Sequence, residues 1–341
     1  MGTVTEVLLE EGKLLCALAP FFVHLRTRVV SSPFLPTLPS KLPSSTSPSS
    51  SAAASIPQCP SNLSSSSCSP TSSTNSLIEK ILSSTPLLES FGNSATLRNS
   101  NSSRFGKYIT LNFGRKGVIG GQVETFLLEK VRVTSQGKGE RGFHIFYQLA
   151  EGFVKGKGVG KLREILPKYH TPSHHGDDFA CSLSYAFGGG VTEIRGMDDF
   201  SCYNELVTSM KSLGWSDGRI GEVFDVVAGV LIMGQVKFEE VEIGGELKCK
   251  IGDSSASVVS DVCSLWGVSE SFLTSALTRK VMVTRGETMW INLTVQQGMD
   301  GRDSLARNVY GGLFDWVVNQ VNDSIRGWKG EGRDGGSSGS R

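Results

Sequence analysis

The sequence lacks several features that would assign it to a class at once. Its 341 residues carry a net charge of +1, so no bulk attraction to nucleic acid or to an anionic membrane is indicated. No apolar run is long enough to span a bilayer comfortably, which argues against an integral membrane segment. The seven cysteines form no C-x-x-C pair and no regular spacing, so we expect reduced thiols instead of a disulfide framework or a zinc site.

The segments near both termini differ in composition from the middle of the chain. Residues 31–76 hold 19 Ser and 8 Pro with Lys41 as the sole charged residue, and such a composition predicts disorder because little apolar surface can be buried. Residues 327–341 form a Gly/Ser-rich tail of the same kind. Residues 1–30 have an apolar middle, which favours a short amphipathic helix, with an organelle transit peptide as the alternative. One globular stretch, residues 77–326, lies between these segments.

Periodicity predicts a mixed α/β content in the globular stretch, with helix dominating after residue 140. Strands are expected at residues 108–113 and 118–128, joined by the turn Gly114–Gly117, and a short strand is expected at residues 236–241. Helices are expected at residues 143–150, 198–213, 217–233, 255–266, 269–278 and 302–325.

A polar loop directly precedes the first expected strand. Residues 98–107 read Arg-Asn-Ser-Asn-Ser-Ser-Arg-Phe-Gly-Lys, which places amides, hydroxyls and two guanidinium groups in a short stretch. These are the groups that grip a triphosphate and its magnesium ion from one side. An Asn/Ser-rich turn without function is the alternative that composition alone would favour.

The order of residues in this loop, with residues 78–93 before it, resembles the switch I region of a myosin motor domain. Further segments are similar to the same family: residues 143–149 to its "hxFYQL" helix, residues 226–234 to its "AAxLHLGN" helix, and residues 303–307 to its "DALAK" box. The resemblance covers residues 77–326. It implies an α/β fragment of a P-loop NTPase-type myosin motor head, mostly helical with a few strands of the central sheet.

The resemblance implies a role for each residue of the loop. Ser103 would bind the magnesium ion, and Ser102 would lie near the attacking water or its proton path. Asn99 and Asn101 would hold the phosphates or order the loop. Arg104 would close the site through an ion pair with a switch II glutamate. Ser102 and Arg104 are thus the candidate catalytic residues, and Mg-ATP is the implied cofactor.

Glu287 is the second position to which the resemblance assigns a role. It lies sixteen positions before Asp303, where actin-facing loops of the family carry an acidic residue or a phosphorylatable Ser or Thr. The resemblance therefore implies actin filaments as the partner and a cytoplasmic, cytoskeleton-associated protein. A solvated loop glutamate is the alternative.

Two family motifs do not occur in this sequence. There is no G-x-x-x-x-G-K-[ST] phosphate loop and no D-[IL]-x-G-F-E switch II segment. We therefore expect an incomplete head that binds ATP weakly or not at all and does not hydrolyse it, without light chains because no lever arm is present. The alternatives are a non-enzymatic interaction module that binds actin or another protein, and a truncated gene product without motor activity.

Three other stretches are weaker candidates for a site. Residues 156–161 imitate a phosphate loop but fit a basic loop better, because Leu162 follows Lys161 where the motif needs Ser or Thr. The glycines at residues 188–190 favour a flexible turn. The residues His170, His174, His175, Asp177 and Asp178 could form a metal site, although a variable loop is the favoured interpretation.

Overall fold

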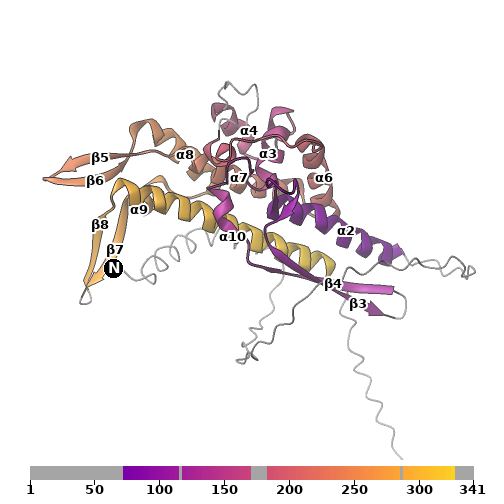
Figure 1. Cartoon of the computed structure of the whole chain (residues 1–341). Helices are drawn as coiled ribbons and strands as arrows, with labels where there is room; N and C mark the ends of the chain where they lie inside the picture. The colour runs from indigo at the N-terminus through magenta and orange to yellow at the C-terminus, as the bar shows by residue number, and fades with distance from the viewer. Residues whose placement is uncertain (1–71, 115–116, 170–182, 285–286, 327–341) are drawn as a thin grey trace, which may run out of the picture.

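The computed structural model describes residues 72–114, 117–169, 183–284 and 287–326 (Figure 1). The predictions for residues 1–71, for the tail at 327–341 and for the cluster at 170–178 lie outside this part. Helix α2 spans Ser72–Gly92, so it begins five residues before the expected start of the globular stretch at residue 77.

Helices form most of the described structure. After α2 come α3 (His144–Val154), α4 (Leu162–Ile165), α5 (Ser184–Phe187), α6 (Asp199–Ser212), α7 (Asp217–Met233), α8 (Ala256–Trp266), α9 (Glu270–Thr278) and α10 (Val295–Ile325). Short 3₁₀ turns are η1 (Lys130–Val133), η2 (Leu166–Tyr169) and η4 (Asp253–Ser255). Side-chain caps fix several helix starts: Asp198 accepts from Phe200 N–H, Ser216 from Arg219 N–H and Ser269 from Phe272 N–H.

The described strands form four antiparallel pairs that do not join into a larger sheet. They are β1 (Asn93–Ser94) with β2 (Ser102–Ser103), β3 (Gly106–Gly114) with β4 (Gly117–Phe126), β5 (Phe238–Ile243) with β6 (Glu246–Ile251), and β7 (Arg279–Thr284) with β8 (Glu287–Asn292). Helices combined with strand pairs confirm the α/β prediction at this coarse level. The strands expected at residues 108–113 and 118–128 correspond to β3 and β4.

Helix α10 organises the molecule. It runs from the β7–β8 hairpin to the β3–β4 hairpin and passes α9, α7 and α2 on the way (Figure 1). It begins seven residues before the predicted start at 302, because Thr294 and Gln297 form a capping box there. Gly298 lies in this additional turn, where a Cβ would stand 2.9 Å from Cys249 Sγ, so glycine lets β6 approach the helix closely.

Two helices are buried on almost every side. Residues 143–150 are all buried in α3 and its N-cap, including His144 and Gln148. Helix α7 is likewise buried almost all round. The reason is that α3 packs against α2, α6 and α7 together, so it has no free face.

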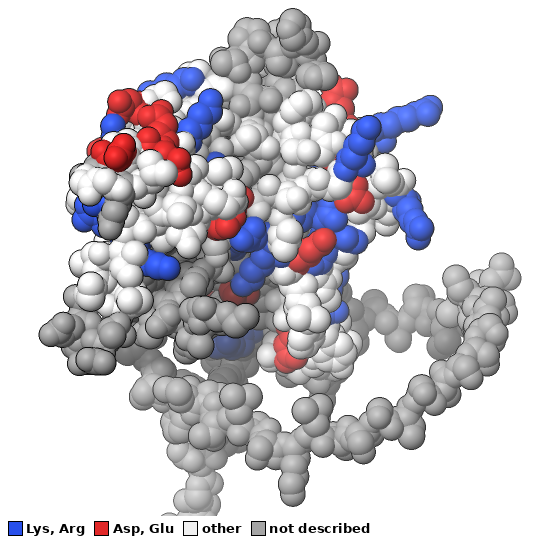
Figure 2. Space-filling model, turned by 60° about the vertical axis from the view of Figure 1, so that its left-hand side comes forward, with Lys and Arg blue, Asp and Glu red and all other residues white. Residues whose placement is uncertain are grey.

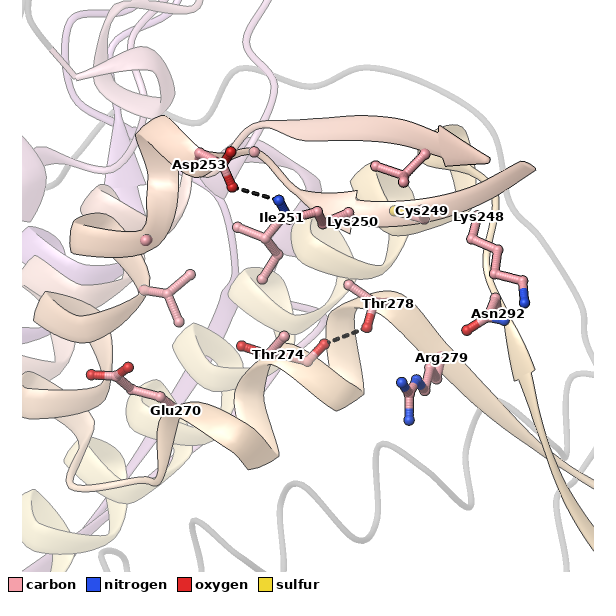
Figure 3. A pocket seen from close by; sticks show the side chains of 14 residues that line it. Lys248, Cys249, Lys250, Ile251, Asp253, Glu270, Thr274, Thr278, Arg279 and Asn292 are labelled. Carbon is pink, nitrogen blue, oxygen red and sulfur yellow. Dashed lines mark hydrogen bonds and ion pairs between the residues drawn. The ribbon is translucent and has the colours of Figure 1, made fainter. Parts of the chain in front are cut away.

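The two hairpins at the left of Figure 1 frame a cavity of about 530 Å³ under β6, bordered by α8 and α9 (Figure 3). Its lining mixes apolar side chains such as Ile251 and Val259 with Thr274 and Thr278. Lys250, also in the lining, is paired with Asp253 at 2.5 Å. On the face shown in Figure 2, basic and acidic side chains both occur, so neither sign of charge covers it alone.

The cysteines at 202, 249 and 263, those within the described ranges, are unpaired thiols, as expected for reduced cysteines. No helix in the described ranges is long and apolar enough to cross a membrane.

Candidate functional site at the loop after helix α2

The predicted phosphate-gripping loop is closed at its base by a short strand pair. Asn93 lies opposite Ser103 and Ser94 opposite Ser102, so β1 and β2 bring the two ends of the loop together. The backbone N–H of Arg104 also donates to the carbonyl of Gly92 at 2.8 Å. The loop therefore leaves the end of α2 and returns to the same place before β3 begins.

Residues inside the loop hold its turn. Thr96 N–H donates to the Asn99 carbonyl at 2.9 Å, and the side-chain oxygen of Asn99 accepts from Asn101 N–H at 2.9 Å. Arg98, Asn99 and Ser100 are exposed. The tip of the loop is consequently ordered by its own polar groups while its outer side stays open to solvent.

The two serines that end the loop have their hydroxyl groups oriented by neighbours. Ser103 Oγ donates to the Phe105 carbonyl at 2.7 Å, which leaves the lone pairs of that oxygen available. Ser102 Oγ accepts from Arg104 Nη2 at 2.6 Å, so its own proton remains available to another acceptor. Ser102, Ser103 and Arg104 are consecutive in the chain, and the hydrogen bond from Arg104 to Ser102 orients the guanidinium group toward the first of the two hydroxyls.

Arg104 has an acidic partner that sequence reasoning missed. Its Nη1 lies 3.2 Å from Glu129 Oε2, and the same carboxylate oxygen lies 2.9 Å from Arg132 Nε. Burial raises the pKa of Glu129, but hydrogen bonds and charges from Arg132 and then Arg104 outweigh burial and hold this pKa below its ordinary value. Glu129 therefore stays ionised at neutral pH and joins the loop to η1.

Asn101 lies between the two helices that flank the loop. Its Oδ1 accepts from Asn93 Nδ2 at 2.8 Å and lies 3.1 Å from His144 Nε2, and its Nδ2 donates to Glu89 Oε2 at 3.0 Å. Glu89 lies in the last turn of α2, Asn93 is the first residue of β1, and His144 is the first residue of α3. No sequence pattern had linked His144 to the loop.

Aromatic packing fixes the loop to α10 from the other side. Phe105 packs edge-on against Phe314 with ring centroids 5.0 Å apart. Tyr310 donates to the Phe91 carbonyl at 2.7 Å and stacks on Phe143 at 5.0 Å. Both ends of the loop are thereby held by the central helix.

Glu287 lies far from this loop in the fold. It is the first residue of β8 and pairs with Thr284 at the tip of the β7–β8 hairpin (Figure 1). Glu287 is thus a strand end, where sequence reasoning had considered a loop. The loop at 98–104 and this hairpin are separate candidate regions.

Comparison with known proteins finds a family match over most of the chain. A family model described as "Myosin head (motor domain)" matches residues 53–333. The chain is 38% identical to unconventional myosin-Ia of Mus musculus over 259 residues, and 36% identical to unconventional myosin-Ib of Homo sapiens over 261 residues. It is also 36% identical to unconventional myosin-Ic of Danio rerio over 259 residues.

The chain belongs to the myosin head (motor domain) family. These alignments cover 75% or 76% of this chain but only 22% to 24% of each relative. The chain therefore spans about a quarter of the length of the curated relatives that it matches.

Proposed function

We propose that residues 93–104 form the switch I side of a Mg-ATP site in an actin-based motor of the myosin family. The observation that carries this proposal is the pair of adjacent hydroxyls, Ser102 and Ser103, each oriented by an intramolecular hydrogen bond next to Arg104. Phosphoryl transfer needs mainly positioning and neutralisation of charge, which hydroxyls, amides and a guanidinium group supply.

Ser103 is the residue that would hold magnesium. A hydroxyl that gives its proton to a backbone carbonyl presents its lone pairs outward, and an oxygen lone pair is the ligand that Mg²⁺ prefers. Magnesium usually takes few protein ligands and keeps several waters, so one hydroxyl beside a triphosphate fits this ion. When bound, the ion would neutralise charge on the phosphate oxygens.

Ser102, Asn99 and Arg104 would act on the phosphate and its water. The free proton of Ser102 can be donated to a phosphate oxygen or to the attacking water, while Arg104 orients this hydroxyl. The amide nitrogen of Asn99 belongs to an exposed side chain, so it can donate to a phosphate. Arg104 pairs with Glu129, whereas the resemblance implies that its partner is a glutamate of switch II.

Actin filaments are the proposed partner, which implies association with the cytoskeleton. Glu287 would face actin from the tip of the β7–β8 hairpin, and its carboxylate would make phosphorylation at this position unnecessary. The sequence contains no G-x-x-x-x-G-K-[ST] motif. We therefore propose that this chain by itself holds ATP weakly and turns it over slowly or not at all.

Amide hydrogen exchange tests the site in the full chain. At millimolar Mg-ATP we expect residues 98–103 to exchange more slowly, and only when magnesium is present. Ser103→Ala should abolish this protection, whereas Ser100→Ala, an exposed serine of the same loop, should keep it. Unchanged exchange in the wild-type chain at every nucleotide concentration would overturn the proposal.

Co-sedimentation with actin filaments tests the partner. We expect the wild-type chain to pellet with filaments, and Glu287→Lys to reduce the bound fraction. Asp253→Lys, a charge reversal at an exposed residue of η4 that is not part of the β7–β8 hairpin, serves as the control. Equal pelleting of the wild-type chain with and without filaments would contradict the assignment of actin.

A further inference from the structure

Both the oxygen and the nitrogen of the Asn101 side-chain amide have hydrogen-bond partners within the protein. Its oxygen receives Asn93 Nδ2 at 2.8 Å and lies 3.1 Å from His144 Nε2, and its nitrogen gives a hydrogen bond to Glu89 at 3.0 Å. An amide oxygen has two lone pairs, so its capacity to accept is used up. Asn101 is therefore bound more completely than any other side chain of residues 98–104.

The partners define which way the amide points and which nitrogen of His144 carries the proton. The nitrogen of Asn101 donates to Glu89 Oε2 and its oxygen accepts from Asn93 Nδ2, so it is the oxygen that faces His144. His144 Nε2 must then be the donor. Burial and the charge of Arg141 lower the pKa of His144 to about 3, so the ring is neutral and its buried Nδ1 keeps a lone pair without a described partner.

These bonds connect the exposed loop to buried structure. His144 is 2% exposed and belongs to α3, which packs against α2, α6 and α7. Residues 98–101, in contrast, are exposed. Ser102 and Ser103 follow Asn101 directly in the chain. The position of their backbone therefore depends on how firmly Asn101 is held.

We propose that His144 is a positioning residue for this loop and that Asn101 is its internal anchor instead of a nucleotide ligand. The hydrogen bond from His144 Nε2 holds the side chain of Asn101 in place, and Asn101 in turn positions the backbone at the start of β2. The proposal rests on the proposed nucleotide site for its functional meaning. The anchoring itself can be tested without nucleotide.

The test compares amide hydrogen exchange of three variants of the full chain with the wild type, in the absence of nucleotide. His144→Leu removes the donor, and His144→Gln returns an amide donor at the same position. Gln148→Leu is the matched control, because Gln148 is one turn further along α3 and 4% exposed, with no described bond to the loop. Amides of α7 report on the stability of the whole core.

We expect His144→Leu to speed exchange at residues 96–104 about tenfold, which corresponds to one lost hydrogen bond, while α7 is unchanged. His144→Gln should restore most of the protection, and Gln148→Leu should leave the loop as in the wild type. Three results would each overturn the proposal. They are an unchanged exchange rate of the loop amides in His144→Leu, an equal increase of the exchange rate in α7, and no slower loop exchange in His144→Gln than in His144→Leu.

A second measurement separates this inference from the proposed function. If the wild-type chain shows magnesium-dependent protection by ATP, His144→Leu should raise the nucleotide concentration needed for it about tenfold. If the wild-type chain shows no such protection, the nucleotide site is wrong. The nucleotide-free exchange data still decide whether His144 anchors the loop.

Discussion

Arg104 Nη1 lies 3.2 Å from Glu129 Oε2, across 25 residues of sequence, and this ion pair joins the candidate loop to η1. Glu129 also binds Arg132, whose side chain is 7% exposed. Arg132 in turn binds Glu140 at 3.0 Å. The loop is thus the outer end of a chain of alternating charges that leads into the core.

Replacing Glu129 by Gln tests this chain of charges. Because the Glu129 side chain is 43% exposed, solvent screens the pair, and we expect a loss of about 1 kcal/mol or less in the free energy of unfolding at neutral pH. The folded-state pKa is below 4.5, so the advantage of Glu over Gln is present above this pH and is lost as the pH falls through the lowered value. Urea denaturation near pH 7 and at acidic pH measures both effects. If the wild type and Glu129→Gln differed by the same free energy of unfolding at both pH values, the contribution of the ion pair would be contradicted.

The buried pair of Arg141 and Asp199 should matter far more. Arg141 is fully buried, and its Nη2 lies 2.9 Å from Asp199 Oδ1. Asp199→Asn leaves a buried cation without a carboxylate, so we expect a loss of about 3–5 kcal/mol in the free energy of unfolding. Asp253→Asn, the same change at an exposed surface pair, should have no measurable effect. Equal losses in chemical denaturation would show that burial does not control the strength of these pairs.

His144 predicts a pH dependence of stability. Its pKa is lowered from 6.5 to about 3 in the folded chain, chiefly by burial, so the unfolded chain binds one more proton between these values. The stabilising contribution is full above 6.5 and is lost as the pH falls toward 3. The free energy of unfolding should therefore drop by about 1.4 kcal/mol per pH unit more in the wild type than in His144→Gln over this window. Parallel pH profiles for the two proteins would contradict the buried neutral ring.

Two glycines of α7 should respond to alanine in opposite directions. A Cβ on Gly229 would stand 2.2 Å from Trp266 Nε1, which donates to the Val226 carbonyl at 3.2 Å. Gly229→Ala must push this indole away, and we expect a loss of about 1–3 kcal/mol in stability. A Cβ on Gly218, in the first turn, would meet only Ser216 Oγ at 4.0 Å, so Gly218→Ala should gain about 0.4–1 kcal/mol. Thermal unfolding followed by tryptophan fluorescence measures both, and a loss in both variants would contradict the described packing.

Much of the fold could be predicted because local patterns were strong. Helices α6, α7 and α9 begin within one residue of their predicted starts, since capping side chains and apolar periodicity agree there. Helix α8 begins one residue after its predicted start without a side-chain cap. The hairpins β5–β6 and β7–β8 were largely missed. Gly244 and Gly245 both have positive φ, which suits a two-residue hairpin turn, so the Gly-Gly pair was the signal that sequence reasoning overlooked.

The candidate site could be predicted in part. The loop residues were found because they are contiguous, and the described structure keeps Ser102, Ser103 and Arg104 together. The partners of the loop could not be found in this way. Glu129 and His144 approach it only after β4 and α3 are in place, so no local spacing encodes these contacts.

The sequence by itself determined the family and the chemical groups of the loop, because the identity and order of residues 98–107 do not depend on the fold. The tertiary structure decided how those groups are used. Packing of α3 between α2, α6 and α7 buries His144 and keeps it neutral, and return of the chain after β4 brings Glu129 to Arg104. Hydrogen bonds and ion pairs act over a few ångströms in space, whatever the separation of their partners along the chain.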